Sequence, residues 1–399
     1  MTEFADGMRE RCEAVLHQNW HEGTRADGVP FAYTAPSPGH YPWQWYWDSC
    51  FTAIAWRHFD PARSRRELES LLAAQRPDGF IGHTIFWDRP LTGPRRFTYN
   101  VTSPDATMTA SIQPPLLAWA WARAVGDPTA EPRLALHHDW LAANRTRDED
   151  GLLWIVQPDE SGLDASPQFD TIWGGEAHGR PGFVGLVRRN RRLGYDLRRI
   201  EAVGRPVCCE VLTNVMYSLS ATALGRPSLT DALVDRLYDE RRGLFLPLAE
   251  AGGRRIHGRN PATIAALAPL ALPDLPEAIG HRLAAHLLDE RTFFSEVAPP
   301  SVSLADPTFT VRDRGPLGLA PVRYWRGPTW VNTAWLCWRG LRRLGYEEPA
   351  RQLADRLARA IATAGLREYY DPHTGAGMGA TDFAWSSLIL EMLDGAAIK

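Results

Sequence analysis

Lysine is almost absent from this chain of 399 residues, because Lys399 is the only one and the other strongly basic residues are arginines. Neither sign of charge dominates: the formal net charge is −3 and the sequence pI is about 6.5. A protein that binds nucleic acid or an anionic membrane surface usually carries a basic patch or a basic excess. The charge balance therefore predicts neither of these partners.

Cysteines and long apolar runs are also scarce. The five cysteines form no CxxC pair, their number is odd and each lies in an apolar stretch: Cys12, Cys50, Cys208, Cys209 and Cys337. Buried free thiols in a reducing compartment are the simplest interpretation. The first ten residues are polar, and no apolar run reaches the length of a membrane span. We expect a soluble cytoplasmic protein, and the sequence leaves a homo-oligomer open.

Several catalytic signatures are missing. The chain has no HExxH, no Cys/His set at zinc spacing, no GxGxxG after a strand, no Walker loop and no GxSxG. These absences argue against zinc peptidases, dinucleotide enzymes, P-loop nucleotidases and serine hydrolases. The sequence predicts no metal and no cofactor.

Tryptophan, in contrast, is abundant: 16 tryptophans exceed the 14 phenylalanines and 11 tyrosines. Residues 41–48 read Tyr-Pro-Trp-Gln-Trp-Tyr-Trp-Asp. Such a run is hard to bury without leaving indole N–H and phenol O–H groups unpaired. It suits a ligand with apolar faces and many hydroxyl groups, such as a sugar. The alternative is an aromatic plug at a helix start, and Trp43 and Tyr46 also fit plain packing.

Helical periodicity dominates the rest of the chain. The expected helices cover residues 49–60, 64–76, 105–125, 131–146, 207–225, 228–241, 260–272, 276–290, 328–344, 347–364 and 381–394. Helix pairs are punctuated by acidic turns such as Asp78-Gly79 and Asp150-Gly151, so they must pack side by side. About six pairs closed into a ring give an all-α (α/α)6 barrel with loop insertions at its mouth. An open solenoid is the alternative.

No Ser/Gly-rich linker divides the chain, so residues 1–399 are expected to form one catalytic domain. The Gly- and Arg-rich stretch 174–206 is predicted to be a long loop or lid over the mouth. His83 fits either the mouth or a structural role. His137 and His138 are predicted to lie solvated on a surface helix.

Carboxylates occur in three settings at helix–loop junctions: Asp48 after Trp47, the segment 160–170, and the segment 367–372. An acidic residue in a partly apolar cleft has a raised pKa, as a general acid requires. Two such groups are the minimum for glycoside hydrolysis. Taken singly, each also fits a helix cap or a turn.

Seven motifs occur in an order that resembles glycoside hydrolase family 63, and more closely its bacterial mannosylglycerate/glucosylglycerate hydrolase branch. They begin at Trp47-Asp48, Gln75…Asp78-Gly79-Phe80-Ile81, Ser111-Ile112-Gln113, Glu160-Ser161-Gly162-Leu163-Asp164, Tyr324-Trp325-Arg326-Gly327, Glu368-Tyr369-Tyr370-Asp371 and Asp382-Phe383-Ala384-Trp385. The loop at 160–164 also resembles trehalases of a related family. The resemblance covers roughly residues 30–395.

The resemblance implies an (α/α)6 barrel and an inverting α-glycosidase acting on a small sugar substrate. In it, Asp164 would be the general acid and Glu368 the general base, with their carboxyl groups about 6.5–9.5 Å apart to hold a water. Trp47 and Asp48 would grip the sugar. Further positions that the family uses around the pocket are matched by Tyr41, Gln113, Trp325 and Arg326.

Departures from the family pattern concern the substrate. The usual His-Pro-Trp-Glu-Ser-Gly-x-Asp-Asn loop here has Asp159 in place of Trp and Ala165 in place of Asn. Glucosylglycerate or mannosylglycerate is the first expectation, and its carboxylate would need a cation. Arg326 is one candidate and the run Arg188–Arg192 another, although a solvated charge run also explains the latter.

Other functions stay open. Within the same clan the substrate could be trehalose, kojibiose or the end of an α-glucan. A sugar 2-epimerase shares the barrel and the length. A resemblance to such an enzyme would include a pair of histidines working as acid and base, and this arrangement is not found. A non-catalytic sugar-binding protein would keep Trp47 and Asp48 but should have lost Asp164 or Glu368, and both are present.

Overall fold

The computed structural model describes residues 2–88, 107–177, 180–312 and 324–394. Within these ranges six helical segments form an inner ring in which each contacts the next and the last contacts the first. In chain order they are α2 (Tyr46–Trp56), α5 (Leu117–Ala124), α10 (Val211–Ala223), the 3₁₀ helix η5 (Ile264–Ala271), α13 (Val331–Arg343) and η8 (Ala384–Leu388), which continues into α15 (Ile389–Leu393).

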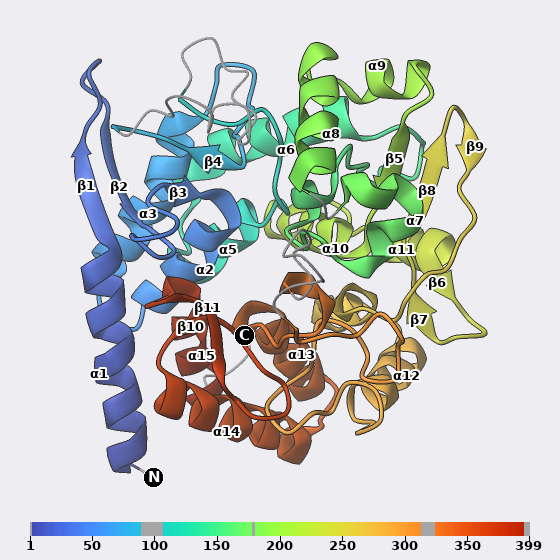
Figure 1. The fold of residues 1–399 in the computed structure, drawn as a ribbon. Helices are drawn as coiled ribbons and strands as arrows, with labels where there is room; N and C mark the ends of the chain where they lie inside the picture. Colours follow the sequence, from blue (N-terminus) through green and yellow to red (C-terminus); the bar gives the residue numbers. More distant parts are fainter. Residues whose placement is uncertain (1, 89–106, 178–179, 313–323, 395–399) are drawn as a thin grey trace.

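An outer layer covers this ring (Figure 1). Its helices are α1 (Thr2–Asn19), α3 (Pro61–Ala74), α6 (Glu131–Arg145), α11 (Thr230–Leu237), α12 (Glu277–Leu287) and α14 (Glu347–Ala364). Because η8 packs on α2, the ring is closed, and the open solenoid is wrong. The (α/α)6 barrel predicted from the helix pairs is confirmed.

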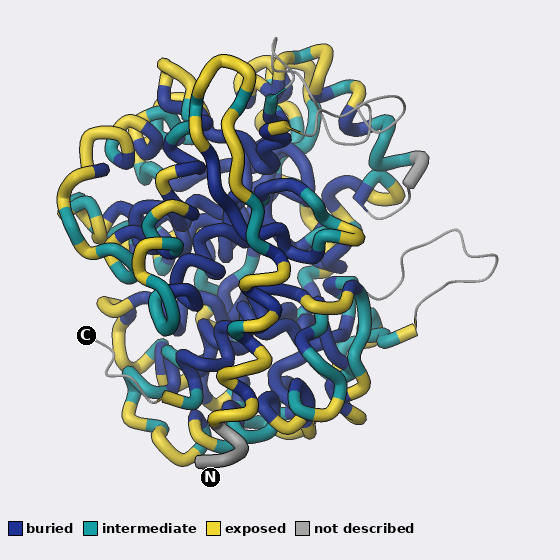
Figure 2. Tube along the Cα trace, turned by 90° about the vertical axis from the view of Figure 1, so that its left-hand side faces the viewer, coloured by how far each residue is buried: buried dark blue, intermediate teal, exposed yellow. Residues whose placement is uncertain are grey.

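Sequence pattern explains which helix takes which layer. Every residue of α2 is buried, as a helix enclosed by neighbours on all sides requires. In α14 the apolar residues Leu353, Leu357 and Ile361 recur every four positions and are buried, whereas its charged residues face outward. Figure 2 shows the resulting arrangement, with buried segments in the interior and exposed segments around the periphery.

Short antiparallel strands decorate the helices. They pair as β1 (Trp20–Thr24) with β2 (Pro30–Thr34), β3 (Gln44–Trp45) with β4 (Thr84–Ile85), β6 (Tyr238–Asp239) with β7 (Leu244–Phe245), and β10 (Arg367–Tyr370) with β11 (Gly377–Thr381). A three-stranded sheet has the order β5 (Pro206–Cys209), β8 (Leu248–Ala251), β9 (Arg254–Arg255). These strands lie in the segments that connect the helices.

The two ends of the described chain are tied together. The side chain of Asn19 donates to the carbonyl oxygen of Asp382 at 2.7 Å, and Ser37 donates to that of Thr381 at 2.9 Å. In Figure 1 the blue helix α1 accordingly lies beside the red C-terminal elements. Among the described helices, none combines the length and the apolar character of a bilayer span.

Several expected elements differ in the structure, two of them in ways that their residues explain. Of the predicted helix 105–125, residues 105–106 lie outside the described ranges, residues 107–116 are not helical, and α5 begins after Pro114-Pro115. Proline lacks the N–H that a helix interior needs, which explains the late start. Residues 207–209, predicted as helix, belong to β5.

Where the structure describes it, the stretch 174–206 is mostly helical and not the long loop that the sequence predicts. It contains η4 (Gly174–Glu176), α8 (Arg180–Arg192) and α9 (Leu197–Ala202). On α8 the side chains of Leu186, Val187 and Asn190 share one buried face, spaced as neighbours on a helix surface. The arginines among them obscured this face in the sequence.

Candidate active site

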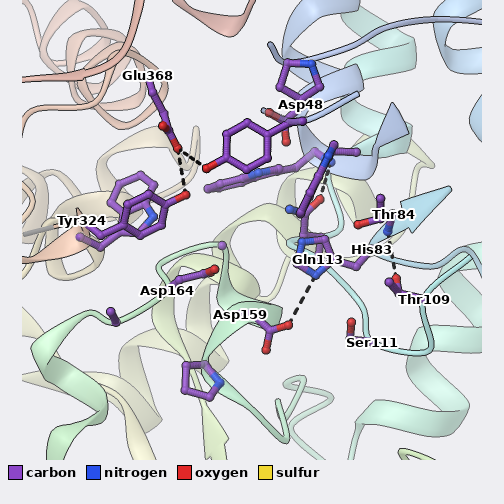
Figure 3. Close-up of a pocket in the computed structure, with 18 of the residues that line it drawn as sticks. Asp48, His83, Thr84, Thr109, Ser111, Gln113, Asp159, Asp164, Tyr324 and Glu368 are labelled. Atoms are coloured by element: carbon purple, nitrogen blue, oxygen red, sulfur yellow. Dashed lines mark hydrogen bonds and ion pairs between the residues drawn. The ribbon is translucent and has the colours of Figure 1, made fainter. Parts of the chain in front are cut away.

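A cavity of about 370 Å³ opens at the end of the ring where the loops enter the inner helices. This volume lies within the range of about 300–1,000 Å³ typical of small-molecule sites. The wall comes from segments far apart in the chain, and includes Tyr41, Trp47, Asp48, Gln113, Asp164, Trp325 and Glu368. Figure 3 shows labelled side chains from these segments around one space.

The aromatic run is divided by the pairing of β3 with β4 and the start of α2. Tyr41, Trp45 and Trp47 line the cavity, together with Asp48 in the first turn of α2. Tyr46 instead points into the helical layer, where its hydroxyl lies 3.1 Å from His137 Nε2. Trp43 packs edge-on against Phe86 outside the cavity wall.

Trp47 is held by three separate elements. Its indole packs edge-on against Trp385 with ring centroids 5.5 Å apart, and its backbone N–H donates to Gln113 Oε1 at 2.9 Å. Gly162, with φ +72, lies so close that a Cβ atom there would be 2.5 Å from the indole. Glycine is therefore required at this turn both for its backbone and for the space that Trp47 occupies.

The carboxyl groups in the loop around η2 (Pro158–Ser161) have different surroundings. Glu160 forms a buried bidentate pair with Arg145, at 2.7 and 2.9 Å, and also accepts from the backbone N–H groups of Ile112 and Val156. All of its acceptor positions thus serve the fold. Asp159 and Asp164, on either side of it, line the cavity.

Glu368 reaches the cavity from β10, at an irregularity in the β10–β11 register. Its carboxylate accepts hydrogen bonds from the hydroxyls of Tyr41 and Tyr324, both at 3.0 Å (Figure 3). It also accepts one from the N–H of Ala380 at 2.9 Å. Gly379 has φ +67, and a Cβ atom there would lie 2.5 Å from Glu368 Oε2.

Burial raises the pKa values of these acids. It raises the pKa of Asp164 to about 6, with the charge of Glu368 adding to the effect. Burial also raises the pKa of Glu368, but the donors Ala380, Tyr41 and Tyr324 oppose the rise by stabilising the charged form. The pKa of Asp48 lies well above its ordinary value because of burial and the neighbouring carboxylates.

Trp325 and Arg326, both predicted to lie around the pocket, differ in their position relative to the cavity. Trp325 lines the cavity and stacks on Trp330 at 3.8 Å. Arg326, the next residue, is not part of the cavity wall that the structure describes. Its guanidinium forms a bidentate pair with Asp170, at 2.7 and 2.9 Å, and donates to the carbonyl oxygen of Ala165 at 3.0 Å.

The histidines predicted to be solvated are buried: His137 and His138 are 6% and 7% exposed. Their helix α6 lies in the outer layer, but they face inward, and His138 stacks on Tyr217. His83 lines the cavity and contacts Trp45 edge-on. Within the described ranges, no cluster of three or more His, Cys, Asp or Glu side chains has the arrangement of a metal site.

Several residues of the wall are not among the site residues predicted from the sequence, and Tyr324, Asp159 and Trp45 are three of them. Tyr324 belongs to the motif from which only Trp325 and Arg326 are predicted as site residues. In the sequence, Asp159 is only a departure from the family loop, and Trp45 is only part of the aromatic run. The alternation of Tyr41, Trp43, Trp45 and Trp47 did not distinguish the cavity side from the packing side, because the segment is no regular strand.

Comparison with known proteins agrees with this architecture. The family described as "Mannosylglycerate hydrolase MGH1-like glycoside hydrolase domain" matches residues 41–386. A mannosylglycerate hydrolase of Rubrobacter radiotolerans is 30% identical over 90% of this chain and 92% of its own length. A glucosylglycerate hydrolase of Mycolicibacterium hassiacum is 26% identical over 89% of this chain and 92% of its own.

Solved structures of glycosidases are also similar to this chain. The family 63 mannosylglycerate hydrolase from Thermus thermophilus, in complex with Tris, superimposes with a TM-score of 0.78 at 26% identity, covering 97% of this chain and all of that one. A neutral trehalase from Saccharomyces cerevisiae, at 16% identity and a TM-score of 0.54, shares the fold. The chain therefore belongs to glycoside hydrolase family 63, among the enzymes with an MGH1-like domain.

Proposed function

We propose that this enzyme hydrolyses the α-glycosidic bond of a small sugar glycoside with inversion at the anomeric carbon. The observation that carries the proposal is the unequal setting of two buried carboxyl groups in one cavity. Asp164 has its pKa raised to about 6, whereas Glu368 accepts three hydrogen bonds that favour its charged form. Neighbouring carboxyls that differ in this way can divide the roles of acid and base.

In the proposed reaction Glu368 accepts a proton from a water molecule, and the water oxygen forms a bond to the anomeric carbon. Asp164 gives its proton to the glycosidic oxygen as the bond from that oxygen to the anomeric carbon breaks. The products are the β-anomer of the sugar and the free alcohol. Exchange with solvent then returns the proton from Glu368 and restores the one on Asp164.

The sugar ring is proposed to lie against Trp47, whose indole face suits the C–H groups of a pyranose. Asp48 would bind two of its hydroxyl groups. Gln113 fixes the Trp47 backbone through the 2.9 Å hydrogen bond, so it acts by holding this wall in place. Tyr41 and Trp325 complete the wall around the sugar.

For the leaving group, the names of the relatives make glycerate the first candidate, joined to glucose or mannose. The guanidinium of Arg326 is already paired with Asp170, which argues against Arg326 as the partner of a glycerate carboxylate. Trehalose is the second substrate to test. Which hexose is preferred depends on how Asp48 and its neighbours meet the hydroxyl group at C2.

We also propose a cytoplasmic location, supported by the cysteines. All five are free and buried. Burial raises the pKa of Cys12 and of Cys337 to about 12, which keeps these thiols protonated and unreactive. Unpaired thiols of this kind are typical of a reducing compartment.

An NMR time course with α-glucosylglycerate, α-mannosylglycerate and trehalose tests the reaction. The expected result is rapid loss of one glycerate glycoside with the β-anomer of the sugar appearing first. If the α-anomer forms first, the inverting assignment is wrong. If neither glycerate glycoside is consumed, the leading substrate is wrong.

The two carboxyl roles are tested separately. Asp164→Asn and Glu368→Gln should each lower kcat on the glycoside by at least about 100-fold, while the thermal unfolding midpoint stays close to that of the wild type. With α-glycosyl fluoride, whose leaving group needs little protonation, Asp164→Asn should recover much of its rate and Glu368→Gln should not. Near-wild-type turnover of either variant on the glycoside would refute its assigned role.

A further inference from the structure

A group of polar side chains in the cavity wall has no use in the reaction described so far. Asp159, His83, Thr84 and Ser111 all line the cavity, and all are buried. Among the described residues, Asp159 Oδ1, Thr84 Oγ1 and Ser111 Oγ are buried atoms without a hydrogen-bond partner. Such atoms cost free energy unless they are satisfied, so three in one wall point to a polar ligand.

Backbone pairing fixes this group, which we call the polar wall. The N–H of His83 donates to the carbonyl oxygen of Ser111 at 2.9 Å, and the N–H of Thr109 donates to that of Thr84 at 3.0 Å. Asp159 faces the two paired segments from the loop that also carries Asp164 (Figure 3). The polar wall is therefore held by the fold and does not depend on a ligand to assemble.

The side chains of Asp159 and His83 face each other across a short gap. Asp159 Oδ2 accepts a hydrogen bond from Gln157 at 3.0 Å and lies 3.8 Å from His83 Nδ1. The second distance is too long for a direct hydrogen bond. An oxygen atom to the side of the line that joins Oδ2 and Nδ1 can hydrogen-bond to both groups, as a ligand hydroxyl does.

The polar wall lies on the side of Asp164. Burial is the main cause of the raised pKa of both Asp159 and Asp48; among the charges, that of Asp164 raises the pKa of Asp159 most and that of Glu368 raises the pKa of Asp48 most. In Figure 3 the side chains of Asp159 and His83 lie below the level of Asp48 and Glu368, on the same side as Asp164. Since a general acid protonates the glycosidic oxygen, the groups beyond it meet the leaving group.

We propose that Asp159 and His83 bind a hydroxyl group of the leaving group, next to the glycosidic oxygen, and so select small leaving groups of the polyol type. This inference rests on the proposed function, because the leaving-group side is defined by Asp164.

The protonation states suit such a contact. Burial, together with the charges of Asp164 and Glu160, raises the pKa of Asp159 well above its ordinary value, which favours the neutral acid. Burial lowers the pKa of His83 to about 3, which keeps the imidazole neutral. A neutral acid and a neutral imidazole each offer a donor and an acceptor, so together they match a hydroxyl group without placing a charge beside Asp164.

Two substrates that differ in one hydroxyl group test the proposal. They are the 2-O-α-glycosides of D-glycerate and of D-lactate, with the hexose that the wild type prefers, since lactate lacks only the C3 hydroxyl. Asp159→Ala should lower kcat/KM for the glycerate glycoside by about tenfold to a hundredfold, the effect of one hydrogen bond to a buried group. Its kcat/KM for the lactate glycoside should stay within about threefold of the wild type.

Two further variants separate binding from structure. Asp159→Asn keeps a donor and an acceptor at the same place, so it should restore most of the preference for the glycerate glycoside. Asp235→Ala removes an exposed carboxyl on the outer helix α11 and should change neither rate. Thermal unfolding midpoints identify any variant that has lost its fold.

The outcomes are distinguishable. An equal loss on both glycosides in Asp159→Ala would overturn the inference and leave the proposed function standing, because Asp159 would then act on the chemistry or on Asp164. A wild type that hydrolyses neither glycoside would overturn the proposed substrate, and the inference with it. A wild type that does not favour glycerate over lactate would overturn the inference alone.

Discussion

Glu160 and Asp164 lie four residues apart on one loop, and their carboxyl groups have opposite surroundings. Glu160 is neutralised by Arg145 and by two backbone donors, whereas the pKa of Asp164 is raised to about 6. The residue types alone do not distinguish the roles of these two carboxyl groups. Partners from distant segments decide the difference, so the sequence indicated this loop as a candidate but needed a resemblance to select Asp164.

Glu368 shows the same dependence on distant partners, and it permits a test at the level of single atoms. The hydroxyls of Tyr41 and Tyr324 donate to its carboxylate and lower its pKa. Replacing Tyr324 or Tyr41 by phenylalanine removes one donor, so the pKa of Glu368 should rise. Because the base must be deprotonated, the acidic limb of the kcat/KM profile should move to higher pH in each variant, and further in the double variant.

The alkaline limb provides an internal comparison, since it is assigned to Asp164 and should move less. Tyr46→Phe is the matched control: it removes the hydroxyl of a buried tyrosine that points away from the cavity toward His137. Acidic limbs that coincide in all variants and the wild type would show that Glu368 is not the base observed in kcat/KM.

At the scale of elements, periodicity predicted most of the helices, but the ends of several of them differ in the structure. The prediction 347–364 coincides with α14, whose apolar residues keep a four-residue spacing. The prediction 207–225 ran through β5 because Val207, Cys208 and Cys209 are apolar and buried in either structure. The loop predicted over 174–206 is wrong at α8, because the arginines of this helix conceal a narrow buried face.

The β10–β11 hairpin offers a test of how an element positions a side chain. A methyl group on Gly379 would meet Glu368 Oε2 at 2.5 Å, so Gly379→Ala must displace the carboxylate. Alanine also resists the left-handed backbone, at a cost of about 1 kcal/mol in the free energy of unfolding. We expect a modest loss of stability and a loss of kcat of at least about tenfold, since small displacements of a catalytic group are costly.

Gly345→Ala separates these two effects. Gly345 has φ +78 at the end of α13, and a Cβ atom there would meet nothing within 4 Å. Gly345→Ala should therefore lower the free energy of unfolding, measured by urea denaturation, by a similar amount and leave kcat unchanged. If both variants keep full activity, the contact between Gly379 and Glu368 does not position the carboxylate.

For the whole molecule, the closed ring explains why the site could be located but not assembled from the sequence. Helix pairs separated by turns predicted a toroid, and a toroid brings its loops together at one end. Which loops lie opposite each other depends on closure between α2 and η8, a contact between residues more than 300 positions apart. No local pattern records it, and Tyr41 meets Glu368 only as its result.

The same closed core buries carboxyl groups that should make the stability of the whole protein depend on pH. Glu67, in α3, is fully buried and accepts hydrogen bonds from Thr34 and Ser49, which join α3 to β2 and α2. Burial raises its pKa from 4.5 to about 7. The folded protein thus binds more protons than the unfolded chain between these pH values, so stability falls as the pH rises through this window.

Glu67→Gln removes this proton linkage. Between about pH 4.5 and about pH 8, the free energy of unfolding of the variant should gain about 3 kcal/mol relative to the wild type, at about 1.36 kcal/mol per unit of pKa difference. Urea denaturation at both pH values measures the change, and the other buried acids cancel because both proteins contain them. Glu69→Gln, an exposed carboxyl on the same helix, is the control and should keep a constant offset. An equally constant offset for Glu67→Gln would mean that folding does not raise the pKa of Glu67, with the hydrogen bonds from Thr34 and Ser49 compensating for its burial.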